Sequence, residues 1–169
     1  MEKERLHLSP HPSLTWAAAL FVLLATSCSM PYVVVVRDPL TASEHNDLGV
    51  AYERKGQLDL AEKEYLRAGE KDRKWALPLF NLGNIAYGRS DLETAEGYYR
   101  RALALDEANP DIMNNLASLL HDISLDHEAA ALISKALSIE RKPEYLDTYK
   151  KIMGYFPDED EALDAVDTE

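Results

Sequence analysis

The sequence predicts an all-α fold, a solenoid of three helix-turn-helix repeats followed by a C-terminal capping helix. The main observation is a period of 34 residues that runs through residues 42–143 without insertion or deletion and is marked by Ala61, Ala95 and Ala129. Within each period, apolar residues recur at spacings of three and four, the pattern of one face of a helix. A register kept over about a hundred residues is typical of a repeat array and not of a chance helical pattern.

The composition is that of one globular domain with flanking segments, because 169 residues allow one modest core rather than two. The formal net charge of −12 argues against nucleic acid as a partner, since phosphate contacts need clustered Lys and Arg. Many of the acidic residues fall within residues 157–169, where we expect a disordered acidic tail. The single cysteine, Cys28, excludes an intrachain disulfide.

Residues 1–27 are predicted to be a signal peptide. A polar stretch over residues 1–15 precedes a dense apolar run from Trp16 to Ala25. This run is about half of the roughly 20 residues that a helix needs to cross a bilayer, but it suits the core of a secretory signal. No protein span of the membrane is expected from it.

The apolar run ends in Leu24-Ala25-Thr26-Ser27-Cys28, which places small residues directly before the cysteine. This ending resembles the lipobox of bacterial lipoproteins, in which the signal is cut before the cysteine and the cysteine is acylated. The resemblance implies a lipid anchor on Cys28 and a lipidated tether over residues 28–41. Because Ser29 follows the cysteine where Asp commonly signals inner-membrane retention, it also implies the outer membrane, facing the periplasm. An ordinary signal peptide or signal anchor with an incidental cysteine is the alternative.

The first repeat is expected over residues 42–75. Thr41 and Glu44 have the spacing of a capping box, so the first helix should begin at Ala42 and run to about Lys55, closed by Gly56. A second helix then follows and ends near residue 71. The same pattern recurs over 76–109, with a turn at residues 90–91, and over 110–143, where Asn109 caps a helix that starts with proline.

Small residues fall where two helices of a repeat must approach closely, and large residues one turn away fill the gaps. The small residues are Gly49, Gly83 and Ala117 on the first helices and Ala61, Ala95 and Ala129 on the second helices. The large ones opposite include Tyr65, Tyr99 and Ile133.

These positions resemble the tetratricopeptide repeat. The family pattern stands here as Leu48-Gly49, Tyr52, Gly56, Ala61, Tyr65 and Ala68, and recurs as Leu82-Gly83, Ala95, Tyr99 and Ala102. The third copy is looser, with Ala117, Ser124 and Ile133. The resemblance implies a right-handed α-solenoid. Because each repeat cannot bury its apolar face alone, we expect a capping helix over residues 144–156, introduced by Pro143, with Tyr145, Leu146, Tyr149, Ile152, Met153 and Phe156 on one face.

A solenoid of this kind has a concave groove lined by the first helix of each repeat. The fifth, sixth, ninth and twelfth places, counted from Ala42, Ala76 and Pro110, should point into it. They hold Asn46, Asp47, Val50 and Glu53; Phe80, Asn81, Asn84 and Tyr87; and Asn114, Asn115, Ser118 and His121.

Asparagine amides both donate and accept hydrogen bonds, so this groove is predicted to hold an extended peptide whatever its side chains. Phe80 and Tyr87 would add apolar contact area. The alternative is that the asparagines are only solvated polar residues on a helix face. Some members of the family grip a terminal carboxylate with Lys and Arg, but here those places hold Asn46, Val50, Asn81, Asp111 and Asn115. A ligand held by its terminal carboxylate is therefore disfavoured.

No catalytic motif, phosphate-binding loop or calcium loop is present, so neither an enzymatic activity nor a cofactor is expected. The histidines His45, His121 and His127 are predicted to be single surface residues, and a metal shared by His121 and His127 is not expected.

The sequence thus predicts a non-enzymatic, membrane-anchored adaptor or scaffold of the bacterial cell envelope. Similar small repeat lipoproteins act as pilotins or as adaptors for envelope enzymes, and the partners would be other envelope proteins. The alternative is a self-associating structural module, a homo-oligomer in which a neighbour's valine-rich segment, Val33–Val36, fills the groove.

Overall fold

The computed structural model describes residues 38–155. The predicted signal peptide, Cys28 and the predicted acidic tail lie outside these residues. The described part contains helices and no strand: α2 (Ala42–Glu53), α3 (Leu58–Lys71), α4 (Ala76–Gly88), α5 (Leu92–Leu105), α6 (Pro110–Asp122), α7 (Asp126–Ile139) and α8 (Pro143–Met153).

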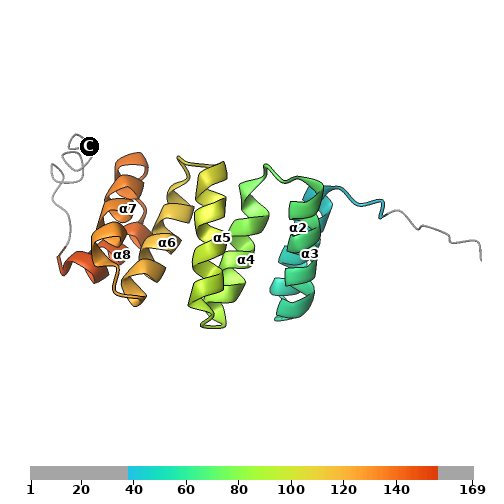
Figure 1. The fold of residues 1–169 in the computed structure, drawn as a ribbon, viewed down its shortest axis with the longest axis horizontal. Coiled ribbons are helices and arrows are strands. Elements are labelled where there is room, and N and C mark those ends of the chain that lie inside the picture. The colour runs from blue at the N-terminus through green and yellow to red at the C-terminus, as the bar shows by residue number, and fades with distance from the viewer. Residues whose placement is uncertain (1–37, 156–169) are drawn as a thin grey trace, which may run out of the picture. The chain divides into compact units, whose positions relative to one another are not determined.

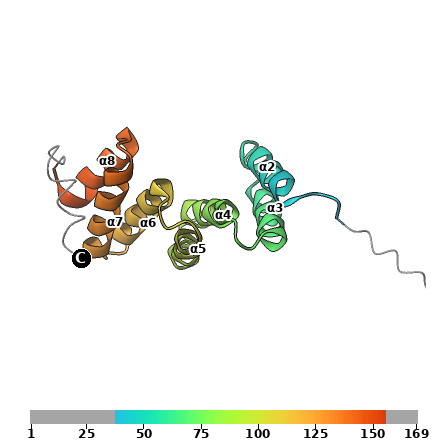
Figure 2. The same cartoon turned by 90° about the horizontal axis from the view of Figure 1, so that it is seen from above.

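The helices pair in chain order. α2 packs against α3, α4 against α5 and α6 against α7, and each pair contacts the next through α3 with α4 and α5 with α6 (Figure 1). α8 packs on α7 and α6. Figure 2 shows the first helices α2, α4 and α6 in one layer and the second helices α3, α5 and α7 in the other. The predicted all-α solenoid with a C-terminal capping helix is confirmed.

The first helix begins as predicted but ends two residues early. Thr41 Oγ1 accepts a hydrogen bond from the Glu44 N–H at 3.2 Å, and Glu44 Oε2 accepts one from the Thr41 N–H at 2.7 Å, which completes the capping box. The helix ends at Glu53 because the chain turns through Gly56, whose φ of 71° lies in the left-handed region. The Gln57 N–H donates back to the Tyr52 carbonyl at 3.0 Å, as in a Schellman motif.

The same turn recurs in the other repeats without glycine. Ser90 and Ser124 adopt φ values of 61° and 64° at the equivalent positions. The Asp91 N–H donates to the Ala86 carbonyl at 3.0 Å, and the Leu125 N–H donates to the Leu120 carbonyl at 2.8 Å. The repeat thus keeps the turn even where serine must occupy the left-handed region, which glycine occupies at lower cost.

Close contacts between the helices of each repeat match the predicted small and large residues. A Cβ atom added to Gly49 or to Gly83 would lie 2.5 Å from the ring of Tyr65 or of Tyr99. Both rings are completely buried. The third repeat has Ala117 where the others have glycine, and there the partner is an isoleucine, Ile133, also completely buried. Where the first helix carries a methyl group in place of glycine, the second helix therefore carries a smaller side chain in place of tyrosine.

The predicted surface position of His45 is wrong. His45 is 0% exposed, and its Nδ1 lies 2.6 Å from Oε2 of Glu64, which is 7% exposed. The other carboxylate oxygen of Glu64 accepts from Arg67 at 2.7 Å. One and two repeats further on, the position of His45 is taken by the buried residues Leu79 and Met113. This position belongs to the core in every repeat. The 34-residue register, applied to His45, would have predicted that its side chain is buried.

The glycine–tyrosine contact predicts a coupled effect on stability. Gly83→Ala should lower the free energy of unfolding by about 1–3 kcal/mol, because the new methyl group overlaps the Tyr99 ring. In a Tyr99→Ile background, the same change should cost at least about 1 kcal/mol less, because the pair then matches Ala117 and Ile133. Urea unfolding of the four proteins in this cycle measures the coupling. Equal costs of Gly83→Ala in both backgrounds would show that the contact does not set the helix spacing.

Candidate functional site

Five asparagines from the first helices form one cluster. This asparagine cluster consists of Asn46 on α2, Asn81 and Asn84 on α4, and Asn114 and Asn115 on α6. Because the first helices of successive repeats lie side by side, equivalent positions meet across the repeat boundaries.

Side-chain hydrogen bonds connect the asparagines across the repeats in two groups, Asn46 with Asn81 and Asn84 with Asn114 and Asn115. Asn81 Nδ2 donates to Asn46 Oδ1 at 3.0 Å and thereby joins α4 to α2. Asn115 Nδ2 donates to Asn84 Oδ1 at 2.9 Å and joins α6 to α4. Within α6, Asn114 Nδ2 donates to Asn115 Oδ1 at 3.1 Å. The amides are thus held in fixed positions by one another before any ligand binds.

The cluster is also fixed to the core. Asn84 Oδ1 accepts a second hydrogen bond, at 2.8 Å, from the hydroxyl of Tyr99. Burial raises the pKa of that hydroxyl well above its ordinary value, so it remains a donor at neutral pH. Its ring packs against Gly83, the residue before Asn84. The contact that spaces α4 and α5 therefore also orients the Asn84 amide.

The structure places most of the predicted groove residues on this face but not all in the same way. Asn46 is only 4% exposed, so it supports Asn81 rather than presenting its own amide. Asp47 and Glu53 are exposed, and Glu53 accepts from the Tyr65 hydroxyl at 2.6 Å. The remaining predicted residues are half-buried: Val50, Phe80, Asn81, Asn84, Tyr87, Asn114, Asn115, Ser118 and His121.

A hollow of about 210 Å³ opens beside the cluster. The predicted residues Asn84, Tyr87, Asn114, Asn115 and Ser118 line it, together with Thr148 from the capping helix α8. The Oδ1 atom of Asn114 is buried and has no hydrogen-bond partner among residues 38–155. An unsatisfied buried acceptor is unfavourable by about 1–3 kcal/mol, so a ligand N–H that reaches it would gain a fully formed hydrogen bond.

Two tyrosine–aspartate–lysine groups border this face and were not predicted. Asp122 accepts from Lys151 Nζ at 2.8 Å and from the Tyr87 hydroxyl. Asp111 accepts from Lys142 Nζ at 3.0 Å and from the Tyr145 hydroxyl. Both groups tie α6 to α8. Lys142 and Tyr145 lie 31 and 34 residues after Asp111, about one repeat away, so the register is the only sequence signal that points to the contact.

These contacts change the acidity of the groups involved. Burial favours a higher pKa for Asp122, but hydrogen bonds from Lys151 and Tyr87 and the Lys151 charge outweigh it, so the pKa lies below its ordinary value. The pKa of Asp111 is lowered in the same way, against its burial, by Tyr145 and Lys142. Burial and the hydrogen bond to Asp111 raise the pKa of Tyr145 to about 12.

The described residues offer hydrogen-bonding groups and apolar surface. Between residues 38 and 155, no cluster of His, Cys, Asp and Glu side chains could hold a metal ion. His121 bonds to Asp126 at 2.6 Å, while His127 is exposed. No helix in this part of the chain is long and apolar enough to cross a membrane.

The repeated helix pairs, their Gly–Tyr contacts and the shared turn define the tetratricopeptide-repeat fold. A family model described as tetratricopeptide repeat matches residues 80–145. No curated protein matches the sequence.

Solved structures of the same fold match most of the chain. The first tetratricopeptide-repeat domain of Spaghetti (RPAP3), bound to the HSP90 peptide SRMEEVD, has a TM-score of 0.65 and 18% identity, with 71% of this chain and 96% of that chain covered. The tetratricopeptide-repeat domain of Arabidopsis OM64 has a TM-score of 0.63 and 18% identity, with 68% of this chain and 95% of that chain covered. The N-terminal domain of stress-induced protein-1 (STI-1) from C. elegans has a TM-score of 0.56 and 18% identity, with 66% of this chain and 94% of that chain covered. At this identity the likeness shows the fold alone.

The Asp122 group predicts an acid-sensitive contribution to the docking of α8. Because the pKa of Asp122 is lowered in the folded state, its contribution is present above the unfolded value near 3.8 and is lost as the pH falls through the folded value. Asp122→Asn should lower the free energy of unfolding by up to about 1 kcal/mol at pH 7, and by less near pH 3. Chemical denaturation at both pH values measures this. The control is Asp147→Asn, on the exposed surface of α8; an equal loss there would contradict the assignment.

Proposed function

We propose that this chain is a non-enzymatic adaptor that binds an extended segment of another protein on its asparagine cluster. The observation that carries the proposal is the hollow lined by Asn84, Asn114 and Asn115, where Asn114 also has a buried Oδ1 without a hydrogen-bond partner among residues 38–155. A buried acceptor that lacks a donor within the described chain is suited to a donor from a partner. An extended backbone supplies such donors at regular intervals.

The surrounding residues favour recognition of a backbone rather than of a particular side chain. The amides of Asn81, Asn84 and Asn115 are half-buried and held in place by hydrogen bonds within the cluster. Phe80 and Tyr87 contribute partly buried aromatic surface at the same face. Amides of this kind pair with N–H and C=O groups that every peptide has, so the partner's sequence would matter less than its extended shape.

The mode of binding should differ from that of the family members that grip a terminal carboxylate with Lys and Arg. One solved structure with this fold contains a bound HSP90 peptide. Here Asp111 occupies one place where some family members carry a cation, and its carboxylate is already neutralised by Lys142. At these places a terminal carboxylate would meet uncharged amides and the Asp111–Lys142 ion pair, and it would find no unpaired cation to hold it. We therefore propose an internal extended segment as the ligand.

The proposed setting is the bacterial cell envelope, with a lipid anchor on Cys28 in the outer membrane, facing the periplasm. This part rests on the lipobox-like sequence that ends at Cys28 and on Ser29 after it. Several acyl chains on one cysteine would give a stable anchor, whereas a single chain binds membranes only marginally. The partners would be other envelope proteins, as for a pilotin or an adaptor of envelope enzymes.

Removing the proposed acylation site should release the protein from membranes. Cys28→Ser should move most of the chain from the membrane to the soluble fraction and abolish metabolic labelling with a radioactive fatty acid. Ser27→Ala, which keeps a small residue before the cysteine, is the control and should fractionate normally. Unchanged membrane recovery of Cys28→Ser would show that the anchor is not a lipid on this residue.

Removing two amides of the cluster should weaken partner capture. Asn81→Ala combined with Asn115→Ala deletes the donors that bridge the repeats, and we expect at least a five-fold lower yield of the captured protein from solubilised envelopes, with unchanged helical content. The amide control is Gln57→Ala, at an exposed position between α2 and α3. Equal yields from both variants would contradict the site. Recovery of this chain itself as the captured species would favour the self-associating alternative.

A further inference from the structure

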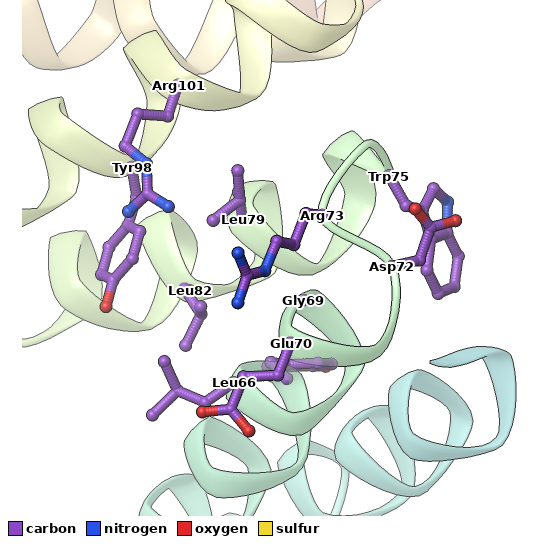
Figure 3. Close-up of a pocket in the computed structure, with 11 residues that line it drawn as sticks. Leu66, Gly69, Glu70, Asp72, Arg73, Trp75, Leu79, Leu82, Tyr98 and Arg101 are labelled. Carbon is purple, nitrogen blue, oxygen red and sulfur yellow. The ribbon is translucent and has the colours of Figure 1, made fainter. Parts of the chain in front are cut away.

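A second cavity lies between the first two repeats. This seam pocket has a volume of about 380 Å³ and opens between α3, α4 and α5, as Figure 3 shows. Its apolar wall is formed by Leu66, Leu79 and Leu82, and Trp75 and Tyr98 stand at its edges. No residue of the asparagine cluster lines it.

The seam pocket lacks a side chain that the equivalent cavity between repeats two and three, of about 310 Å³, contains. Gly69 lies in the last turns of α3, where glycine is unfavourable for a helix. At the same place in the next repeat, 34 residues later, Leu103 lines the equivalent space between repeats two and three. A Cβ added to Gly69 would meet only the Cβ of Pro78, at 4.0 Å. The seam pocket therefore has room for an aliphatic side chain that this part of the chain does not provide.

Two arginines lie at the seam pocket. Arg73 and Arg101 both line it, and within the described chain neither has a carboxylate within 4.0 Å. The guanidinium of Arg101 lies 5.8 Å from the centre of the Tyr98 ring. In the next repeat the position of Arg73 is taken by Glu107 and that of Arg101 by Lys135, so the cation at residue 73 is what distinguishes the seam pocket. The carboxylates of Glu70 and Asp72 also line the cavity. That of Asp72 accepts a hydrogen bond from the Lys74 N–H at 3.0 Å and points towards Trp75, away from the arginines (Figure 3).

The pattern calls for an aliphatic side chain with a carboxylate on either side, and the end of this chain contains that pattern. Residues 164–167 read Asp-Ala-Val-Asp, so Val166 has carboxylates two residues before it and one residue after it. We propose that the seam pocket seats the C-terminal segment of the same chain, with Val166 in the space beside Gly69 and with Asp164 and Asp167 next to Arg73 and Arg101.

The chain is long enough for this. Val166 lies eleven residues after Tyr155, the last described residue, and an extended segment of that length spans up to about 36–40 Å. α8 packs on α6 and α6 packs on α5, so two helix spacings of about 8–10 Å each separate α8 from the seam pocket. The two helix spacings together with the full length of α8, about 16 Å, do not exceed the distance that the extended segment can span.

The test uses the full chain with a photoreactive aliphatic residue, bearing a diazirine, in place of Val166. After illumination at low protein concentration, we expect intrachain crosslinks to peptides that contain Leu66–Trp75 or Tyr98–Arg101. Crosslinks spread over the whole surface, or found only between two copies, would overturn the proposal.

Filling the cavity should displace the segment without harming the fold. Gly69→Leu, which copies Leu103 of the next repeat, should lower the crosslink yield at least five-fold while the melting temperature stays the same or rises. The matched control is Gly97→Leu on α5, where an added Cβ would meet nothing within 4 Å. An unchanged yield in Gly69→Leu would overturn the proposal.

The charges can be tested by exchange. Arg73→Glu with Arg101→Glu should lower the crosslink yield at least five-fold, and Asp164→Lys with Asp167→Lys in the same chain should restore it. Arg54→Glu with Arg141→Glu, at exposed positions elsewhere, should have no effect. A loss without rescue would overturn the charge pairing. None of these outcomes depends on whether the asparagine cluster binds a partner, so the two proposals can fail separately.

Discussion

The contact between a glycine on the first helix of a repeat and a tyrosine ring on the second helix sets the spacing of the helices in this protein. Gly49 with Tyr65 and Gly83 with Tyr99 bring the helices of the first two repeats together until no space remains for a methyl group. The spacing within each repeat decides where the first helices of successive repeats meet, because each repeat is added to the one before. The face that carries the asparagines depends on this contact.

The same contact has a polar end that differs between repeats. In the second repeat the Tyr99 hydroxyl emerges beside Asn84 and bonds to its carbonyl. In the first repeat Val50 occupies the place of Asn84 and cannot accept a hydrogen bond, so the Tyr65 hydroxyl bonds instead to Glu53. In the third repeat Ile133 has no hydroxyl, and the equivalent of Asn84 is Ser118. The amide network is therefore anchored in the middle of the array, where repeats flank it on both sides.

Periodicity predicted the part of the structure that repetition determines. The helix pairs, the capping box at Thr41, the proline-led α6 and the small residues at the close contacts all follow from local pattern and register. The burial of His45 and of Asn46 was missed. The register would have placed His45 in the core with Leu79 and Met113, but the partners of the two side chains, Glu64 and Asn81, lie on other helices. A helix pattern contains no information about such partners.

The candidate site was predictable as a face but not as a cavity. Counting positions along each first helix located the asparagines, yet the hollow also needs Thr148 from α8, whose position is set by Asp111 and Asp122 one repeat away. The seam pocket has more space than the equivalent cavity of the next repeat, because a side chain is absent at Gly69. The hollow needs a side chain from α8, and the seam pocket differs from the equivalent cavity between repeats two and three by Gly69 in place of Leu103, so both become visible only when the helices are compared in three dimensions.

The seam between the first two repeats has a separate role on each of its sides. The Asn81–Asn46 hydrogen bond crosses it among the first helices, and the seam pocket opens between the second helices α3 and α5. A segment bound in the pocket would favour one separation of the two repeats, and the length of the Asn81–Asn46 bond depends on that separation. Binding at either side would then change the affinity at the other by the same factor, since linkage between two sites is reciprocal. The proposed C-terminal segment would thus act on the Asn46–Asn81 pair, which crosses this seam, and not directly on the hollow beside Asn84, Asn114 and Asn115.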